Sequence, residues 1–98
     1  MKTVTICGSM RFADEMIKIA TKLETEHGYC VLQPVYGFDG QPLSGDELAR
    51  IKAAHYKKID LSDAVYIVNI GGYIGQSVTE EIEYAKEHGK EILYHEPI

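Results

Sequence analysis

Residues able to do chemistry gather in one segment, where an apolar run stops at two glycines and a helix pattern begins. The segment reads Asn-Ile-Gly-Gly-Tyr-Ile-Gly-Gln-Ser-Val-Thr-Glu-Glu from Asn69 to Glu81. Backbone amides at the start of a helix point outward and carry partial positive charge, so they suit an anionic ligand. A carboxylate in the same turn stays ionised near neutral pH, as a nucleophile must. The expected ligand-binding residues here are Gly72, Tyr73, Gly75 and Ser77.

The two adjacent glutamates of this segment are separated by their helical phase. Successive helical residues advance by roughly 100°, and Val78 and Ile82 mark the direction that should be buried. Glu80 then points to solvent, whereas Glu81 lies at the edge of the buried stripe and can face a crevice. We therefore expect Glu81 to be the catalytic nucleophile and Glu80 to complete a capping box with Ser77, the expected N-cap. The alternative is that both acids simply favour the helix dipole.

A second glycine-containing loop follows the first predicted strand and has the sequence Gly-Ser-Met-Arg. Gly8 permits a close backbone approach, Ser9 offers a hydroxyl, and Arg11 can place a forked guanidinium on a phosphate. With Met10, these residues are candidates for substrate binding. The alternative is that these four residues form a tight turn with a serine cap and a solvated arginine.

Apolar spacing predicts four strands that alternate with three helices. The strands are expected at Thr3–Cys7, Tyr29–Val35, Ala64–Ile70 and Glu91–His95. The first helix is expected at Phe12–Glu26, with an apolar stripe of Ala13, Met16, Ile17, Ala20 and Leu23, and Gly28 as its C-terminal cap. The second should start at the capping box Ser44-Gly45-Asp46-Glu47 and bury Leu48, Ile51, His55 and Ile59. The third is expected at Ser77–His88.

This order of elements predicts an α/β fold with a four-stranded parallel sheet, right-handed crossovers and helices on both faces. The commonest small arrangement is the three-layer, flavodoxin-like or Rossmann-like sheet with strand order 2-1-3-4. In it, the loops that follow strands one and three diverge and open a crevice at the carboxyl ends of the strands. Gly8–Arg11 and Gly71–Gln76 should therefore converge on one ligand.

Composition and charge limit the function classes. The 98 residues, 45% of them hydrophobic, predict one domain spanning residues 1–98. A net charge of -5 argues against general nucleic-acid binding, which depends on a basic surface. No apolar stretch is long enough to span a membrane, and the N-terminus lacks a secretory pattern, so we expect a cytoplasmic protein. Cys7 and Cys30 are then expected as reduced core thiols.

The histidines give no sign of a metal site. His27, His88 and His95 have no metal-ligand spacing among them, and neither a metal nor a cofactor is expected. His55 lies on an apolar helix stripe, where a lone histidine is usually a satisfied core residue. No Ser/His/Asp or Cys/His arrangement indicates a nucleophilic site.

Taken together, these residues resemble the nucleoside 2-deoxyribosyltransferase superfamily, most of all a small bacterial and phage branch. The resemblance covers nearly the whole chain and rests on Cys7–Arg11, on His55–Asp63 and on Gly71–Ala85. The phrase Cys-Gly-Ser-x-Arg is also similar to the loop that holds the nucleotide in deoxynucleoside monophosphate N-hydrolases. A family glutamate followed four residues later by alanine matches Glu81 and Ala85.

The resemblance implies a flavodoxin-like fold and a reaction. In the family, the glutamate matched by Glu81 attacks the anomeric carbon of a deoxyribose and releases the base. His55 stands where the family commonly has an acid, which implies a place in the substrate site. Family members often complete a site with a neighbouring chain, so a homodimer or larger homo-oligomer is expected.

The favoured hypothesis is an enzyme that cleaves or transfers the N-glycosidic bond of 2'-deoxynucleosides or their 5'-monophosphates, with a glutamate nucleophile. A non-catalytic nucleotide-binding accessory module is the alternative. A phosphoribohydrolase is a third possibility, but the spacing from glycine to glutamate is longer here than that class requires.

Overall fold

A parallel sheet forms the centre of the protein in the computed structural model, which describes residues 1–38, 40 and 42–98. The strands lie in the order β2-β1-β3-β4, and each pairing between neighbours is parallel. Their bounds are β1 (Thr3–Gly8), β2 (Cys30–Leu32), β3 (Ala64–Val68) and β4 (Glu91–Tyr94). The predicted α/β fold class and the predicted strand order are confirmed.

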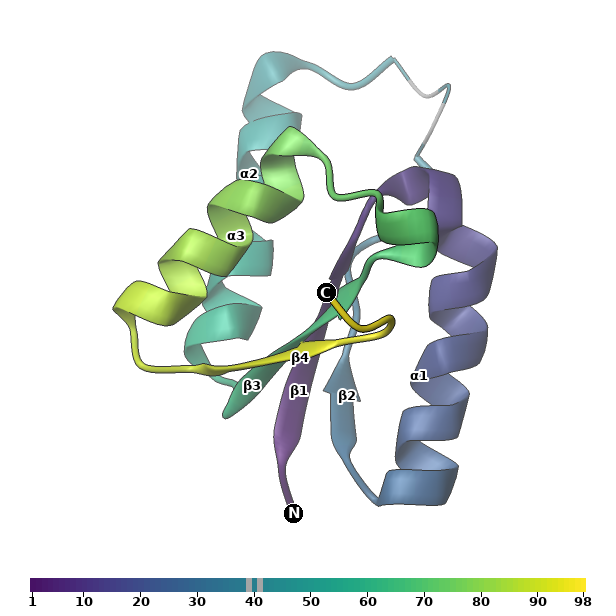
Figure 1. The fold of residues 1–98 in the computed structure, drawn as a ribbon. Coiled ribbons are helices and arrows are strands. Elements are labelled where there is room, and N and C mark those ends of the chain that lie inside the picture. The colour runs from purple at the N-terminus through teal and green to yellow at the C-terminus, as the bar shows by residue number, and fades with distance from the viewer. Residues whose placement is uncertain (39, 41) are drawn as a thin grey trace.

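Helices cover both faces of this sheet and make three layers. They are α1 (Ala13–His27), α2 (Gly45–Asp60) and α3 (Gln76–Glu87), with short 3-10 helices at η1 (Met10–Phe12) and η2 (Ile70–Gly72). Figure 1 shows α1 on one face of the sheet and α2 with α3 on the other, as in a flavodoxin-like fold. None of the described helices is both long and apolar enough to cross a membrane.

The hydrophobic core is divided into two clusters by the sheet. Ile6 and Val68 pack toward α1, whereas Cys7 and Ile67 pack toward α2 and α3. Neighbouring residues of one strand enter opposite clusters because side chains alternate across a strand. This alternation places the Cys7 thiol, which has no exposed surface, beneath α2 and α3.

Three strands end before their predicted last residue: β4 by one residue, at Tyr94 rather than His95, and β2 and β3 by more. β2 ends at Leu32 rather than at Val35, and Pro34, which has no N–H to donate to a ladder, follows it. β3 ends at Val68, and Asn69 turns its side chain to the backbone of Glu96. The Asn69 Nδ2 donates to the Glu96 carbonyl at 2.9 Å, and the Glu96 amide donates to the Asn69 Oδ1 at 2.8 Å. Because β2 and β3 end early, the backbone at their carboxyl ends is not part of the sheet.

Two predicted stripe residues are exposed rather than buried. Ile17 of α1 is 46% exposed, and Ile19 is buried in its place. One residue past Met16 is a rotation of roughly 100°, which carries Ile17 beyond the face that meets the sheet. Leu48 of α2 is 47% exposed because the first turn of α2 lines a cavity rather than the core.

Helix ends follow the sequence for α1 and α2. Gly28 closes α1 in the left-handed conformation at φ 69°, as predicted. At the start of α2, the Ser44 Oγ accepts from the Glu47 amide at 3.1 Å, and the Glu47 Oε1 accepts from the Ser44 amide at 2.9 Å. The predicted capping box is therefore confirmed.

Candidate active site

A cavity of about 420 Å³ lies between α2, the start of α3 and the segments that follow β1 and β2. Its volume is within the range of about 300–1,000 Å³ that small-molecule sites occupy. Two loops that are far apart in the sequence reach it, since Gly8 and Gly75 both lie on its wall. The site is therefore at the carboxyl ends of β1 and β3, where a parallel sheet of this order binds ligands.

Most of the residues proposed from the sequence line this cavity. They are Gly8, Ser9, Met10, His55, Tyr73, Gly75, Ser77 and Glu81. Arg11 and Gly72 are not on its wall. Gly8 also has a packing role, because a Cβ there would lie 3.0 Å from the Met16 Sδ and 3.1 Å from the Val68 Cβ.

Arg11 supports the cavity wall from outside. Its guanidinium lies 3.8 Å from the centre of the Tyr73 ring, and the Phe12 ring meets Tyr73 edge-on with centroids 6.1 Å apart. A cation over an aromatic face stabilises such an arrangement. Arg11 thus holds Tyr73 at the cavity instead of reaching into it.

The two glycines after β3 form a turn. Gly71 and Gly72 have φ of 65° and 80°, values that residues other than glycine rarely adopt. The Gly71 amide donates to both carboxylate oxygens of Glu96 at 3.2 Å. A protein carboxylate thus takes the first amide of this loop, and the ligand-facing part begins further along, at Tyr73.

The first turn of α3 lines the cavity. Gly75 is the N-cap, with an extended backbone and no side-chain cap hydrogen bond. The prediction that Ser77 caps this helix is therefore wrong, because α3 starts one residue earlier than expected. Gln76, Ser77 and Val78 line the cavity, and the first amides of a helix have no partner within it. This end of α3 is suited to an anion.

Glu80 has another role than the predicted capping box. It accepts from the Gln76 Nε2 at 3.1 Å and pairs with the Lys52 Nζ at 3.7 Å. Its side chain is 43% exposed, whereas that of Glu81 is 15% exposed and lies on the cavity wall. These exposures agree with the helical phase, which predicted that Glu80 points to solvent and that Glu81 faces a crevice.

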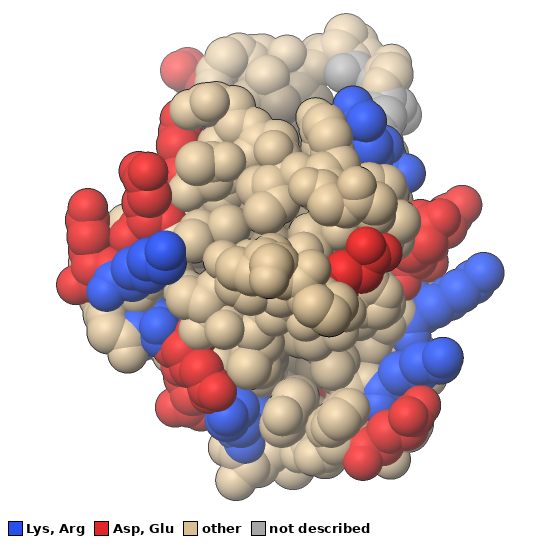
Figure 2. Space-filling view, in the orientation of Figure 1, with Lys and Arg blue, Asp and Glu red and all other residues tan. Residues whose placement is uncertain are grey.

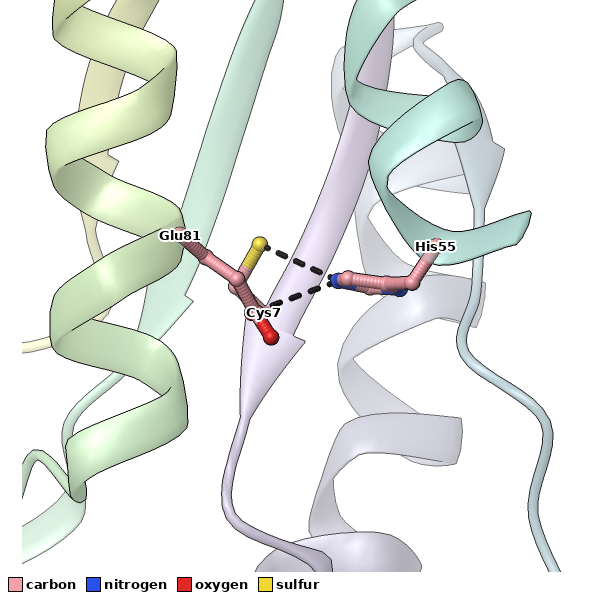
Figure 3. Close-up of side chains that lie close together, drawn as sticks. All are labelled: Cys7, His55 and Glu81. Atoms are coloured by element: carbon pink, nitrogen blue, oxygen red, sulfur yellow. Dashed lines mark hydrogen bonds and ion pairs between the residues drawn. The ribbon is translucent and has the colours of Figure 1, made fainter. Parts of the chain in front are cut away.

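Cys7, His55 and Glu81 meet at the inner end of the cavity and form what we call the floor cluster. Figure 3 shows their side chains pointing toward one another from β1, α2 and α3. The His55 Nε2 lies 3.3 Å from the Glu81 Oε1 and 3.5 Å from the Cys7 Sγ. The His55 Nδ1 is buried and has no hydrogen-bond partner among the described residues. Nε2 is therefore the nitrogen that faces both neighbours.

The electrostatics of the floor cluster identify the group that can attack. Burial raises the pKa of the Cys7 thiol well above 9.0, and the nearby Glu81 carboxylate raises it further. A thiol that stays protonated at neutral pH is a poor nucleophile, so Cys7 can donate a hydrogen bond to the Glu81 carboxylate but is not the attacking group. Among the three side chains, the carboxylate of Glu81 is the candidate nucleophile.

The sequence did not indicate the floor cluster, because Cys7 and His55 are 48 residues apart. Strand alternation could have suggested it, since Cys7 is buried on the face opposite to Ile6. Lys52 was also missed as a residue of the cavity wall. It lies three residues before His55, a spacing that places two helical residues on one face.

Comparison with protein-family models, with curated proteins and with solved structures found no match for this chain. The assignment of function therefore depends on the geometry of the site.

Proposed function

We propose that this protein cleaves or transfers the N-glycosidic bond of 2'-deoxynucleosides or their 5'-monophosphates, with Glu81 as the nucleophile. The observation that carries the proposal is that one wall of the cavity holds both free helix amides and a carboxylate. The sequence resemblance to nucleoside 2-deoxyribosyltransferases suggests the substrate class.

The spacing along α3 supports a sugar phosphate as ligand. Glu81 follows Gln76 by five residues, which is about 7.5 Å of helix at a rise of about 1.5 Å per residue. A phosphate held by the first amides of α3 would extend its pentose down the wall toward Glu81. Lys52, on the facing wall, adds a positive charge for the same phosphate.

The chemistry requires a carboxylate that is ionised and held still. The His55 Nε2, 3.3 Å from the Glu81 Oε1, can donate a hydrogen bond that fixes the carboxylate. A Glu81 oxygen attacks the anomeric carbon, the bond to the base breaks, and water or a second base then displaces the carboxylate. Retaining glycosidases use a carboxylate in the same way. A 2'-deoxy sugar suits this step because positive charge develops more easily at its anomeric carbon.

The test is to incubate the protein with a panel of deoxynucleosides, their 5'-monophosphates and the matching ribonucleotides, and to separate free base by chromatography. We expect base release from deoxy substrates, lost in Glu81→Gln and kept in Glu80→Gln, the matched control one residue away. Absence of release, or release that survives Glu81→Gln, contradicts the proposal.

A nucleotide-binding module without catalysis is the second candidate. The observation that favours it is the composition of the cavity wall, where Glu81 is the single carboxylate among the described residues. Calorimetry that detects nucleotide binding to a protein releasing no base would select this module, and any Glu81-dependent release would exclude it.

We also propose that the protein forms a homodimer. Figure 2 shows a largely uncharged face, with one acidic side chain near its middle and the other charged side chains toward its rim, over the side where β4 lies in Figure 1. β4 ends the order of strands and leaves a backbone edge unpaired among the described residues. Interfaces commonly have charge-depleted centres and polar rims. Sedimentation that detects only monomer at high concentration contradicts the dimer.

A further inference from the structure

We infer that the floor cluster is a binding site for one thiophilic divalent cation, with Zn²⁺ the best match, held by the Cys7 Sγ, the His55 Nε2 and a Glu81 oxygen. The ligand atoms of these three side chains all lie within 4.8 Å of one another. This inference goes beyond the proposed N-glycosidic activity and is tested without it.

Two of the three distances between the ligand atoms match a tetrahedral zinc centre. Bonds of about 2.3 Å to sulfur and about 2.0–2.2 Å to nitrogen and oxygen, at the tetrahedral angle, separate ligand atoms by about 3.3–3.6 Å. In the structure, the Cys7 Sγ lies 3.5 Å from the His55 Nε2, which lies 3.3 Å from the Glu81 Oε1. The third pair, the Cys7 Sγ and the Glu81 oxygen, lies within 4.8 Å, so a bound cation would draw these two side chains closer together.

The ligands of this site are held by secondary-structure elements and are not mobile surface side chains. Its three ligands come from β1, α2 and α3, and the sheet and the two helices fix their positions. Cys7 has no exposed surface, and the side chains of His55 and Glu81 are 10% and 15% exposed. A solvated cluster of acids would have neither this burial nor this mixture of ligand types.

The ligand set selects the metal. A thiolate and an imidazole favour Zn²⁺ and related transition metals, whereas Mg²⁺ and Ca²⁺ prefer oxygen ligands. Binding of the cation displaces the proton of the Cys7 thiol to solvent. Cys7 as thiolate and Glu81 as carboxylate then together balance the charge of a divalent cation. Three protein ligands leave a fourth position, and His55 and Glu81 face the cavity, so that position opens toward the ligand.

Metal binding would change what Glu81 can do. A carboxylate that is coordinated to Zn²⁺ gives electron density to the cation, so its remaining oxygen is a weaker nucleophile toward a sugar. The cation and the proposed reaction therefore compete for Glu81. Zn²⁺ acts on the site as an inhibitor that a chelator reverses.

The experiment measures binding directly. Protein freed of metal with a chelator is titrated with Zn²⁺ in competition with a chromophoric chelator, and separately with Co²⁺ while the absorption spectrum is recorded. We expect one equivalent of Zn²⁺ to bind and Co²⁺ to give the near-ultraviolet charge-transfer band of a thiolate ligand. Failure to bind Zn²⁺, or a Co²⁺ complex without the thiolate band, overturns the inference.

Variants identify the ligands. Cys7→Ser, His55→Gln and Glu81→Gln should each weaken Zn²⁺ binding by more than about 100-fold, since loss of even an outer-shell partner costs about 10–100-fold. Cys30→Ser and His27→Gln, which alter a thiol and an imidazole outside the cavity, are the matched controls and should bind as the native protein does. The near-isosteric His55→Gln and Glu81→Gln keep the test valid if Cys7→Ser unfolds. Weaker binding in the controls alone would assign the metal to another place.

Discussion

The N-termini of α2 and α3 are built from similar residues and end up with opposite roles. Both have a serine near the start and a glutamate three residues after it. At α2, Ser44 and Glu47 satisfy each other's amides and close the helix end. At α3, Gly75 is the N-cap, and the first turn lines the cavity with no side-chain cap.

The closed end of α2 shows that this protein can cap a helix with its own side chains. The missing side-chain cap at α3 therefore points to a ligand site. A capping box stabilises a helix by supplying acceptors for orphan amides. α3 gives up that stabilisation at the cavity, whose wall also includes Lys52 and Glu81. An anionic ligand would supply the missing acceptor, so the uncapped end is the expected phosphate site.

The largest expected effect comes from making α3 resemble α2. Gly75→Asp adds a cap and a negative charge, and we expect nucleotide 5'-monophosphates to bind about 100-fold more weakly, about 2.7 kcal/mol. The backbone of Gly75 is extended, at φ -80° and ψ 176°, and the atoms nearest to the new Cβ would belong to the Tyr73 ring, the closest of them its hydroxyl at 3.3 Å. Calorimetry measures the loss. Gly75→Asn, which caps without charge, should lose less, and unchanged binding by Gly75→Asp would remove the phosphate from this helix end.

The second test removes the capping box at the start of α2. Ser44→Ala should lower the free energy of unfolding by about 1 kcal/mol, seen by circular dichroism as a melting temperature lower by about 4–8 °C. Ser77→Ala removes a serine that caps nothing, so it should change stability by less than about 0.5 kcal/mol. Equal destabilisation by the two variants would mean that the helix ends do not differ as described.

A smaller effect separates side-chain from backbone contributions to the anion site. Lys52→Gln should weaken binding of a 5'-monophosphate about threefold, the size of a solvent-exposed ion pair at about 0.2–1 kcal/mol. The difference should shrink as salt is added, because salt screens exposed charges. Lys57→Gln, an exposed lysine outside the cavity wall, is the matched control. A salt-independent loss would contradict a purely electrostatic role for Lys52.

The last effect concerns the Cys7 thiol of the floor cluster and changes the free energy of unfolding only at alkaline pH. The pKa of Cys7 is raised in the folded protein by burial and then by Glu81, whereas an unperturbed thiol ionises near 9.0. The unfolded chain therefore loses this proton first, and stability falls as pH rises above 9.0 but is unaffected below it. In denaturant titrations, Cys7→Ala and Cys7→Ser should both flatten this fall. A profile identical to that of the native protein would place the Cys7 thiol in solvent.

The sequence predicted the framework well because strand alternation and helical phase are local properties. β-branched and apolar runs located the four strands, and the phase of Val78 and Ile82 distinguished Glu81 from Glu80. The sequence failed where a contact from a distant segment decided the outcome. Asn69 leaves β3 for a partner near the C-terminus, and the floor cluster exists only because α2 and α3 lie over the same strand.

The N-cap of α3 shows a different kind of failure. Ser77 and Glu80 match the capping-box pattern, but Gly75 adopts the extended conformation that starts the helix earlier. A pattern search favours the residue that stabilises a helix best, whereas this helix begins at the residue that leaves its amides free.

The bond between the Glu96 carboxylate and the Gly71 amide has a kinetic consequence. Together with the paired bonds between Asn69 and Glu96, it fastens the turn after β3 to a distant part of the chain before any ligand arrives. A loop already in its final shape loses little conformational freedom on binding. Association should then occur in a single phase, and substitutions in the cavity should change how long a ligand stays more than how fast it arrives.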